Sequence, residues 1–200
     1  MTITSSDVER VFRDSGALRE GHFILASGRH SPLYLEKFQV LQHPAETERL
    51  CSAIAAWARS LEVDTVAGPT TGGIILAHEV ARQLGVRAIY AERREKGTGR
   101  EFRRGFALRP EERVLVVDDI MTTGGSLQET LDAVRSAGGR VVGAAVLVDR
   151  SGGAADLDVG IEALWRLQIP SYAPAECPLC AKGIPATHPG TTPAPAVVSR

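Results

Sequence analysis

The sequence predicts an α/β protein with a doubly wound, mainly parallel sheet and a small N-terminal hood. Three observations predict this class. Short apolar runs alternate with helical apolar patterns through the middle of the chain. Glycines stand where helix C-caps belong, at Gly85 and at Gly138–Gly139. Two acids and a run of small residues follow one expected strand, as at the ligand-binding edge of an open parallel sheet.

The N-terminal part is expected to form a helix, two short strands and a second helix. A capping box at Ser6–Glu9 starts the first helix, whose apolar residues share one face. The strands are expected at residues 23–25 and 33–35. The second helix enters at Pro44. Its apolar residues recur at helical spacing: Leu50, Ile54, Trp57 and Leu61.

The middle of the chain then becomes a regular alternating series. Strands are expected at 63–67, 86–91, 114–117 and 141–148, and helices at 74–84 and 127–137. Such a series places the carboxyl ends of its strands at one edge of the sheet, and ligands of open α/β sheets bind at that edge.

Length and composition predict a single domain over residues 1–200. Two hundred residues with 44% hydrophobic content can bury a full core. Residues from about 1 to 40 are expected to form the hood and about 60 to 150 the sheet core. A tail of about 190–200, rich in Pro, Ala and Thr, is expected to be disordered.

Charge and hydropathy exclude several classes of protein. No apolar run approaches the ~20 residues of a membrane span. The polar start Met1–Asp7 lacks a signal-peptide pattern, so a cytoplasmic protein is expected. A net charge of -1 argues against a bulk nucleic-acid binder.

The segment 114–126 carries the clearest chemical signal. An apolar strand runs into Asp118 and Asp119, and then into a turn of small residues. Glycines and a helix start offer backbone N–H groups to an anion. Because carboxylates repel a phosphate, the acids are expected to face sugar hydroxyls, a metal ion or a developing positive charge. The alternative is a plain strand–turn–helix with an acidic edge.

This segment resembles the phosphoribosyl pyrophosphate (PRPP) signature of the type I phosphoribosyltransferases. The resemblance implies that the acids contact the ribose 2- and 3-hydroxyls and that the following loop holds the 5-phosphate. The implied PRPP-binding residues here are Asp118, Asp119, Ile120, Met121, Thr122, Thr123, Gly124, Gly125 and Ser126. No Gly-Lys-Ser/Thr follows the glycines, so the segment is not a Walker loop.

A second turn, Gly68–Gly73, lies between an expected strand and a helix start. It can offer N–H groups to an anion, or it is only a connecting loop. In the phosphoribosyltransferases the corresponding loop lies against pyrophosphate, which assigns Thr71 and Gly72 to PRPP binding. Orotate enzymes often carry an aromatic–lysine pair where this chain has Thr71-Gly72, so a side-chain charge is missing.

A basic, glycine-containing segment, 93–105, is expected to be a mobile loop that closes over a polyanion. The alternative is a solvated run of charges. The segment resembles the catalytic loop of orotate phosphoribosyltransferases, which reaches into the neighbouring subunit of a homodimer. By order, Arg93, Arg94 and Lys96 correspond to that loop's PRPP-binding residues, and Lys96 to its catalytic lysine. The loop histidine has no counterpart before Gly105.

Two further segments point to the base. Residues 21–34 resemble the N-terminal element of orotate phosphoribosyltransferases, and residues 147–150 resemble the strand end whose arginine meets orotate. The resemblance implies orotate contacts at Thr122 and Arg150, and a guanidinium fork suits a planar carboxylate. The alternative is a surface arginine paired to its neighbour.

One departure from the family stands at Ala26, where many orotate enzymes have lysine. The contact is expected to be absent or supplied by another group, with Lys37 and His30 the nearest candidates.

Three cysteines form no even disulfide framework. The pair Cys177 and Cys180 leaves two alternatives. The sequence favours a solvent-facing turn with free thiols. A structural metal site would need further ligands, of which His188 is the nearest candidate.

Taken together, these resemblances identify the chain as an orotate phosphoribosyltransferase family member, a pentosyltransferase of pyrimidine biosynthesis. The implied substrates are PRPP and orotate, and the implied cofactor is Mg²⁺ held chiefly by substrate oxygens rather than by side chains. The expected catalytic residues are Lys96, Asp118 and Asp119, and the expected assembly is a homodimer. A purine phosphoribosyltransferase and a PRPP-sensing regulator remain alternatives.

Overall fold

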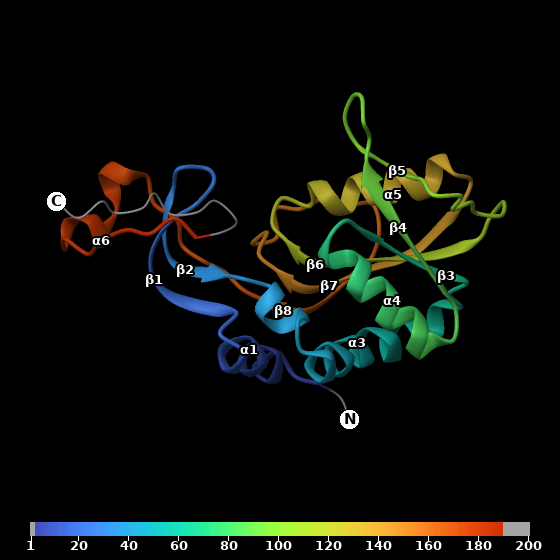
Figure 1. Cartoon of the computed structure of the whole chain (residues 1–200), viewed down its shortest axis with the longest axis horizontal. Helices are drawn as coiled ribbons and strands as arrows, with labels where there is room; N and C mark the ends of the chain where they lie inside the picture. Colours follow the sequence, from blue (N-terminus) through green and yellow to red (C-terminus); the bar gives the residue numbers. More distant parts are fainter. Residues whose placement is uncertain (1–2, 190–200) are drawn as a thin grey trace.

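A six-stranded sheet forms the centre of the computed structural model, which describes residues 3–189 (Figure 1). The strand order is β5-β4-β3-β6-β7-β8, and every neighbouring pair is parallel except β4 and β5. The strands are β3 (Thr65–Pro69), β4 (Arg87–Arg93), β5 (Arg100–Phe102), β6 (Arg113–Met121), β7 (Arg140–Asp149) and β8 (Ile161–Arg166). The predicted doubly wound, mainly parallel sheet is therefore confirmed.

Helices cover both faces of this sheet and enclose two apolar cores. Helices α1 (Ser5–Asp14), α3 (Pro44–Ala58) and α4 (Gly72–Leu84) pack on one face, and α5 (Gly125–Ser136) packs on the other. Because side chains alternate along a strand, Leu115 and Val117 of β6 enter the first core, whereas Val114 and Val116 enter the second. The apolar run of β6 is therefore buried on both faces, as parallel strands require.

The order of the strands places a switch point between β3 and β6. From β3 the chain crosses through α4 to β4 on one side, and from β6 it crosses through α5 to β7 on the other. Such a switch point opens a crevice at the carboxyl ends of the two strands, which is where ligands of this architecture bind.

A two-stranded hairpin lies beside the sheet, in the segment where the hood was expected, and it is called the hood below. It consists of β1 (Leu18–Ile24) and β2 (His30–Leu35), and α2 (Phe38–Leu41) follows it. The C-terminal turns η2 (Pro174–Glu176) and α6 (Pro178–Ala181) lie against this hairpin, at the left of Figure 1. A short 3₁₀ turn, η1 (Arg59–Leu61), ends α3.

Several element boundaries differ from those expected. The first helix is capped by Thr4 and Asp7 rather than by Ser6 and Glu9, because the Thr4 hydroxyl accepts from the Asp7 N–H at 3.2 Å while Glu9 is engaged by Arg13. Strand β6 continues through both acids to Met121, since its backbone stays paired to β7 along the whole length.

Three short elements, α2, β5 and β8, were not expected, because their mixed polar and apolar residues give no clear period. The division into hood, core and tail remains a prediction. The tail at 190–200 falls outside the described residues. Within residues 3–189, no helix is long and apolar enough to cross a membrane.

Candidate functional site

Two helices begin at the switch point, one after each of its strands. α4 begins at Gly72 after β3, and α5 begins at Gly125 after β6. The first N–H groups of both helices have no partner within their own helix, so both offer donors and a positive dipole end to an anion. Gly124 precedes α5 with a φ of 82°, a left-handed conformation that favours glycine.

The acid pair, Asp118 and Asp119, lies in β6 between these two helix starts. Both residues are buried, with 6% and 2% of their surfaces exposed. The Asp119 N–H donates to Asp118 Oδ1 at 2.8 Å, and the Ile120 N–H donates to Asp119 Oδ1 at 2.6 Å. Since consecutive side chains of a strand point to opposite faces, the two carboxyls meet different surroundings.

Asp119 faces the hood side of the sheet, where Lys37 approaches it. The Lys37 ammonium lies 2.9 Å from Asp119 Oδ1 and 2.8 Å from Oδ2. The start of α4 packs directly on the same carboxyl, because a Cβ added at Gly72 would lie 1.8 Å from Asp119 Oδ2. Asp119 is therefore fixed between a cation and a helix N-terminus.

Asp118 faces α5. Burial raises the pKa of Asp118 well above its usual range, and the neighbouring Asp119 raises it further. Hydrogen bonds from the Asp119 N–H and the Ser126 hydroxyl, together with the Lys37 charge, act in the opposite direction. The surroundings of Asp118 therefore favour its protonated form on balance.

Arg100 links the two anion-facing loops, a role that the sequence did not reveal. Its side chain is 4% exposed, and it donates to the Thr70 hydroxyl and to the Ser126 hydroxyl, each at 3.1 Å. Thr70 precedes α4 and Ser126 lies in the first turn of α5, so one guanidinium holds both turns. The signal was hidden because Arg100 sits among five other basic residues of the same segment.

The basic segment is a β-hairpin rather than a loop over all of 93–105. Arg93 ends β4 and residues 100–102 form β5, so the connecting loop spans residues 94–99 and projects beyond the sheet (Figure 1). The expected length was wrong because charged residues can pair as strands when one face is covered. Lys96 is exposed in this loop.

Ion pairs neutralise only some of the basic residues in this segment. Arg104 pairs with Glu92 at 3.0 Å, and Arg103 pairs with Glu95 at 2.6 Å. Among residues 3–189, no acid lies within ion-pair distance of three exposed cations: Arg93, Arg94 and Lys96. The connecting loop therefore carries an excess of positive charge that is free to meet an anion.

Arg150 follows the end of β7, on the other side of β6. Its N–H donates to the Met121 carbonyl at 2.7 Å, which ties it to the end of the acid-bearing strand. Its side-chain Nε is buried and has no hydrogen-bond partner among the described residues. Burial lowers the pKa of Arg150, while the Tyr34 phenol of the hood acts in the opposite direction. A buried, unsatisfied guanidinium donor is costly unless a ligand completes it.

Known proteins with the same arrangement were found by sequence and by structure. A family model described as the phosphoribosyl transferase domain matches residues 39–162. The chain is 51% identical to the orotate phosphoribosyltransferase of Pelotomaculum thermopropionicum over 94% of this chain and 98% of that protein. It is 50% identical to the orotate phosphoribosyltransferase of Desulforamulus reducens, over 90% and 94% of the two chains. The chain belongs to the orotate phosphoribosyltransferase family.

A solved structure of this family agrees with the assignment. The crystal structure of orotate phosphoribosyltransferase from Aeropyrum pernix superposes with a TM-score of 0.68 and 30% identity, covering 80% of this chain and 93% of that one. The predicted family, fold and enzyme class are confirmed by these relatives.

Placed in this orotate phosphoribosyltransferase fold, the predicted site residues fall into two groups. The switch point brings together the acid pair, the Thr71–Gly72 turn and the turn from Thr122 to Ser126. Lys96 lies in the projecting hairpin loop, outside this cluster. Of the two candidates to replace the lysine missing at Ala26, Lys37 reaches the site through Asp119.

The other candidate, His30, lies in a separate cluster with the cysteines. The expectation of a solvent-facing cysteine turn is wrong for Cys177, which is 3% exposed because the hairpin covers it. The ligand candidates beside the cysteines are His22 and His30 rather than His188.

Proposed function

We propose that this chain transfers the 5-phosphoribosyl group of PRPP to orotate, giving orotidine 5-monophosphate and pyrophosphate. One observation carries the proposal beyond family membership. Two helix starts flank a buried acid pair at the switch point, and Arg150 at the next strand end has a buried Nε without a hydrogen-bond partner among the described residues. This arrangement suits a substrate with phosphates at both ends and a planar anion beside it.

PRPP would span the crevice between β3 and β6. The 5-phosphate would bind the turn at 122–126, where helix α5 begins, with backbone contacts at Ile120 and Met121. The pyrophosphate would lie against Thr71 and Gly72 at the start of α4. The ribose hydroxyls would face the acid pair, because carboxylates accept hydrogen bonds from hydroxyls and repel phosphate.

Orotate would bind at Arg150, with Thr122 as a second contact. The orotate carboxylate can accept from the buried Nε of Arg150, which completes a donor that has no partner among residues 3–189. A purine base carries no carboxylate, so it would leave this donor unsatisfied. The site therefore favours the pyrimidine acid over a purine.

The donor set fits Mg²⁺, a hard cation that prefers oxygen ligands. Lys37 is already the ion-pair partner of Asp119, so the metal ion would be held mainly by pyrophosphate and sugar oxygens, with the acid pair beside it. When bound, Mg²⁺ supplies charge neutralisation for the leaving pyrophosphate.

The reaction needs no protein nucleophile. As the ribose C1–O bond to pyrophosphate breaks, positive charge grows on the ribose until a ring nitrogen of orotate bonds to C1. The carboxylate of Asp119, held in place by Lys37, stabilises this charge. Arg93, Arg94 and Lys96 would close over the leaving group, exclude water and place positive charge on the phosphates. We propose that the loop closes over the site of a second subunit in a homodimer.

The proposed activity belongs to pyrimidine nucleotide synthesis in the cytoplasm. Its direct test is incubation of the purified protein with PRPP, Mg²⁺ and a panel of bases. Orotate alone should be consumed, with release of pyrophosphate. Turnover of adenine, guanine or hypoxanthine with orotate inert would reject the proposal.

A pair of arginine variants tests the orotate contact. Arg150→Met should raise the KM for orotate at least tenfold while leaving the KM for PRPP nearly unchanged. Arg166→Met is the matched control, because Arg166 is exposed at the neighbouring strand end and its ion pair among residues 3–189 is with Asp149, at 4.0 Å. Equal effects of the two substitutions would contradict the assignment.

A further inference from the structure

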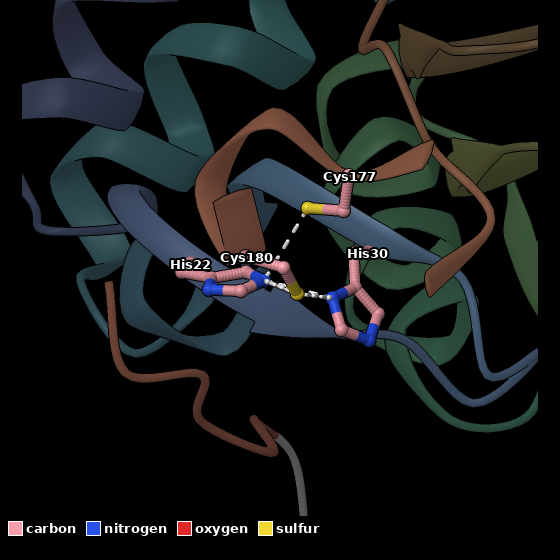
Figure 2. A group of neighbouring side chains, drawn as sticks. All are labelled: His22, His30, Cys177 and Cys180. Atoms are coloured by element: carbon pink, nitrogen blue, oxygen red, sulfur yellow. Dashed lines mark hydrogen bonds between the residues drawn. The ribbon is translucent and has the colours of Figure 1, made fainter. Parts of the chain in front are cut away.

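A second group of polar side chains lies where the hairpin meets the C-terminal segment. His22 of β1 and His30 at the start of β2 face Cys177 and Cys180, the two ends of the Cys-Pro-Leu-Cys turn (Figure 2). One ligand atom from each residue lies within 4.8 Å of the other three. His22, His30 and Cys177 are buried, and Cys180 closes the cluster on its exposed side.

The distances between these atoms approach those of a tetrahedral metal centre. Cys177 Sγ lies 3.5 Å from His22 Nε2, and Cys180 Sγ lies 3.7 Å from the same nitrogen and 3.3 Å from His30 Nδ1. Tetrahedral zinc with its usual bond lengths separates sulfur from nitrogen by about 3.6 Å and nitrogen from nitrogen by about 3.3 Å. The two ring nitrogens, 2.8 Å apart, need to separate only slightly.

The ring of His22 is oriented as a metal ligand. Its Nδ1 lies 2.7 Å from the Ile184 carbonyl, which can only accept, so Nδ1 carries the hydrogen and Nε2 carries a lone pair aimed into the cluster. Metal-binding histidines commonly donate their second N–H to a carbonyl in this way. Nε2 of His22 faces His30 and both sulfurs, and a metal ion between them would accept an electron pair from each of the four ligand atoms.

The C-terminal segment has little else to hold it. Among the described residues from 171 to 189, Cys177 is the only buried one. The helical turns η2 and α6 are three and four residues long. Up to residue 189, the backbone of this segment pairs with the hairpin only beside the two histidines, between His30 and Tyr172 and between Thr187 and the strand from His22 to Ile24. A segment without an apolar core is typically fixed by a cross-link or a metal.

We propose that His22, His30, Cys177 and Cys180 bind one Zn²⁺ ion as a closed structural site. Two sulfur and two imidazole ligands in a tetrahedron are a zinc ligand set. Both thiols lose their protons to solvent on binding, so the two thiolates cancel the charge of the ion and the buried centre stays neutral. Four protein ligands leave no position for water, so the ion stabilises the fold and takes no part in the reaction.

The site connects the N-terminal hairpin to the C-terminal segment beside the hairpin turn. His22 and His30 flank the hairpin turn that contains Arg29, whose Nε donates to the Ser171 hydroxyl of the C-terminal segment at 2.9 Å. Zinc would fix this turn on both sides. If the turn helps to bind orotate, zinc also preorganises that contact, and this last step alone rests on the proposed function.

Metal analysis of the full-length protein, expressed without a histidine tag, tests the site. We expect one Zn²⁺ per chain after dialysis, and a loss of at least tenfold in bound zinc in Cys177→Ser/Cys180→Ser. Cys51→Ala and His188→Ala are matched controls, because Cys51 is buried in the core away from the cluster and His188 lies outside it. Both controls should keep their zinc. Unchanged zinc in the double variant would overturn the proposal.

A second measurement covers variants that fail to fold. Reduced wild-type protein, stripped of metal with a chelator, should take up one Co²⁺ and show the intense visible bands of a tetrahedral thiolate complex, which added Zn²⁺ abolishes. Metal removal should lower Tm, and zinc should restore it. Failure of the reduced wild-type protein to bind either ion would overturn the proposal. Isolation of the protein with a Cys177–Cys180 disulfide in place of bound zinc would also overturn it. None of these readouts depends on orotate turnover, so the two proposals fail separately.

Discussion

The ion pair between Lys37 and Asp119 offers a quantitative test of how the acid pair is held. Lys37→Met removes the cation and keeps most of the apolar stem. At the 2.8 Å separation, the gross Coulomb attraction is about 6 kcal/mol with an effective dielectric constant of 20. Most of this attraction offsets the desolvation of Asp119, whose side chain is only 3% exposed, while that of Lys37 is 33% exposed.

Removing one partner of such a pair is costly because the other stays buried. For a fully buried pair the loss is about 3–5 kcal/mol. With one-third of Lys37 exposed, we expect a loss of about 2 kcal/mol, and hence a fall in Tm of about 4–8 °C for a chain of this size. The proposed function adds that kcat/KM should fall at least tenfold, or about 1.4 kcal/mol, because Asp119 loses its fixed position.

A double-mutant cycle isolates the pair. Free energies of unfolding from urea titrations of Lys37→Met, Asp119→Asn and the double variant should give a coupling of about 1–3 kcal/mol. Lys182→Met is the control for loss of one positive charge, because Lys182 is exposed and lies in the C-terminal segment. Additivity of the two single changes within about 0.5 kcal/mol would refute the argument that Lys37 holds Asp119.

Three further predictions concern other parts of the molecule. Gly72→Ala should lower kcat/KM on the order of 100-fold, because the added Cβ displaces Asp119. Gly160→Ala is the control and should change kcat/KM little, because the space around its Cβ is open. Equal kcat/KM values of the two variants would contradict the contact between Gly72 and Asp119. Hydrogen bonds outweigh burial and lower the pKa of Glu112 to about 2, so its stabilisation is lost as pH falls from about 4.5 to 2. The difference in Tm between wild type and Glu112→Gln should therefore shrink as the pH falls over this range. A Tm difference that stays constant with pH would contradict this prediction. Inactive Lys96→Ala subunits mixed with subunits inactivated at both acids should recover about a quarter of wild-type activity; verified exchange without recovery would place Lys96 outside the partner's site.

The mainly parallel sheet could be predicted from the sequence because two local signals agreed. Apolar runs of strand length alternated with helical patterns, and glycines marked the helix ends. The end of β6 was placed too early, because acids were taken to end a strand. Asp118 and Asp119 instead remain in the ladder with β7, since pairing depends on the backbone and each carboxyl finds a cation or donor on its own face.

The contacts that complete the site could not be predicted, because they join residues far apart in the chain. Lys37 and Asp119 are 82 residues apart, and the lysine comes from the segment between the hood and α3. Arg100 needed the β4–β5 hairpin before its guanidinium could reach both helix starts. Neither contact leaves a signal in the local sequence, because nothing beside Lys37 or Arg100 distinguishes it from other basic residues of the chain.

The two histidines of the cysteine cluster could have been found from the sequence with a different search rule. His188 is close to the cysteines in sequence, but a metal site selects residues that are close in space. His22 and His30 are eight residues apart, and a hairpin between them brings such positions onto facing strands, with Ile24 opposite His30. A Cys-x-x-Cys turn and two histidines on either side of an expected hairpin turn together supply four ligands from two rigid turns. This combined pattern, rather than the nearest histidine, is the signal to search for when a Cys-x-x-Cys pair lacks partners.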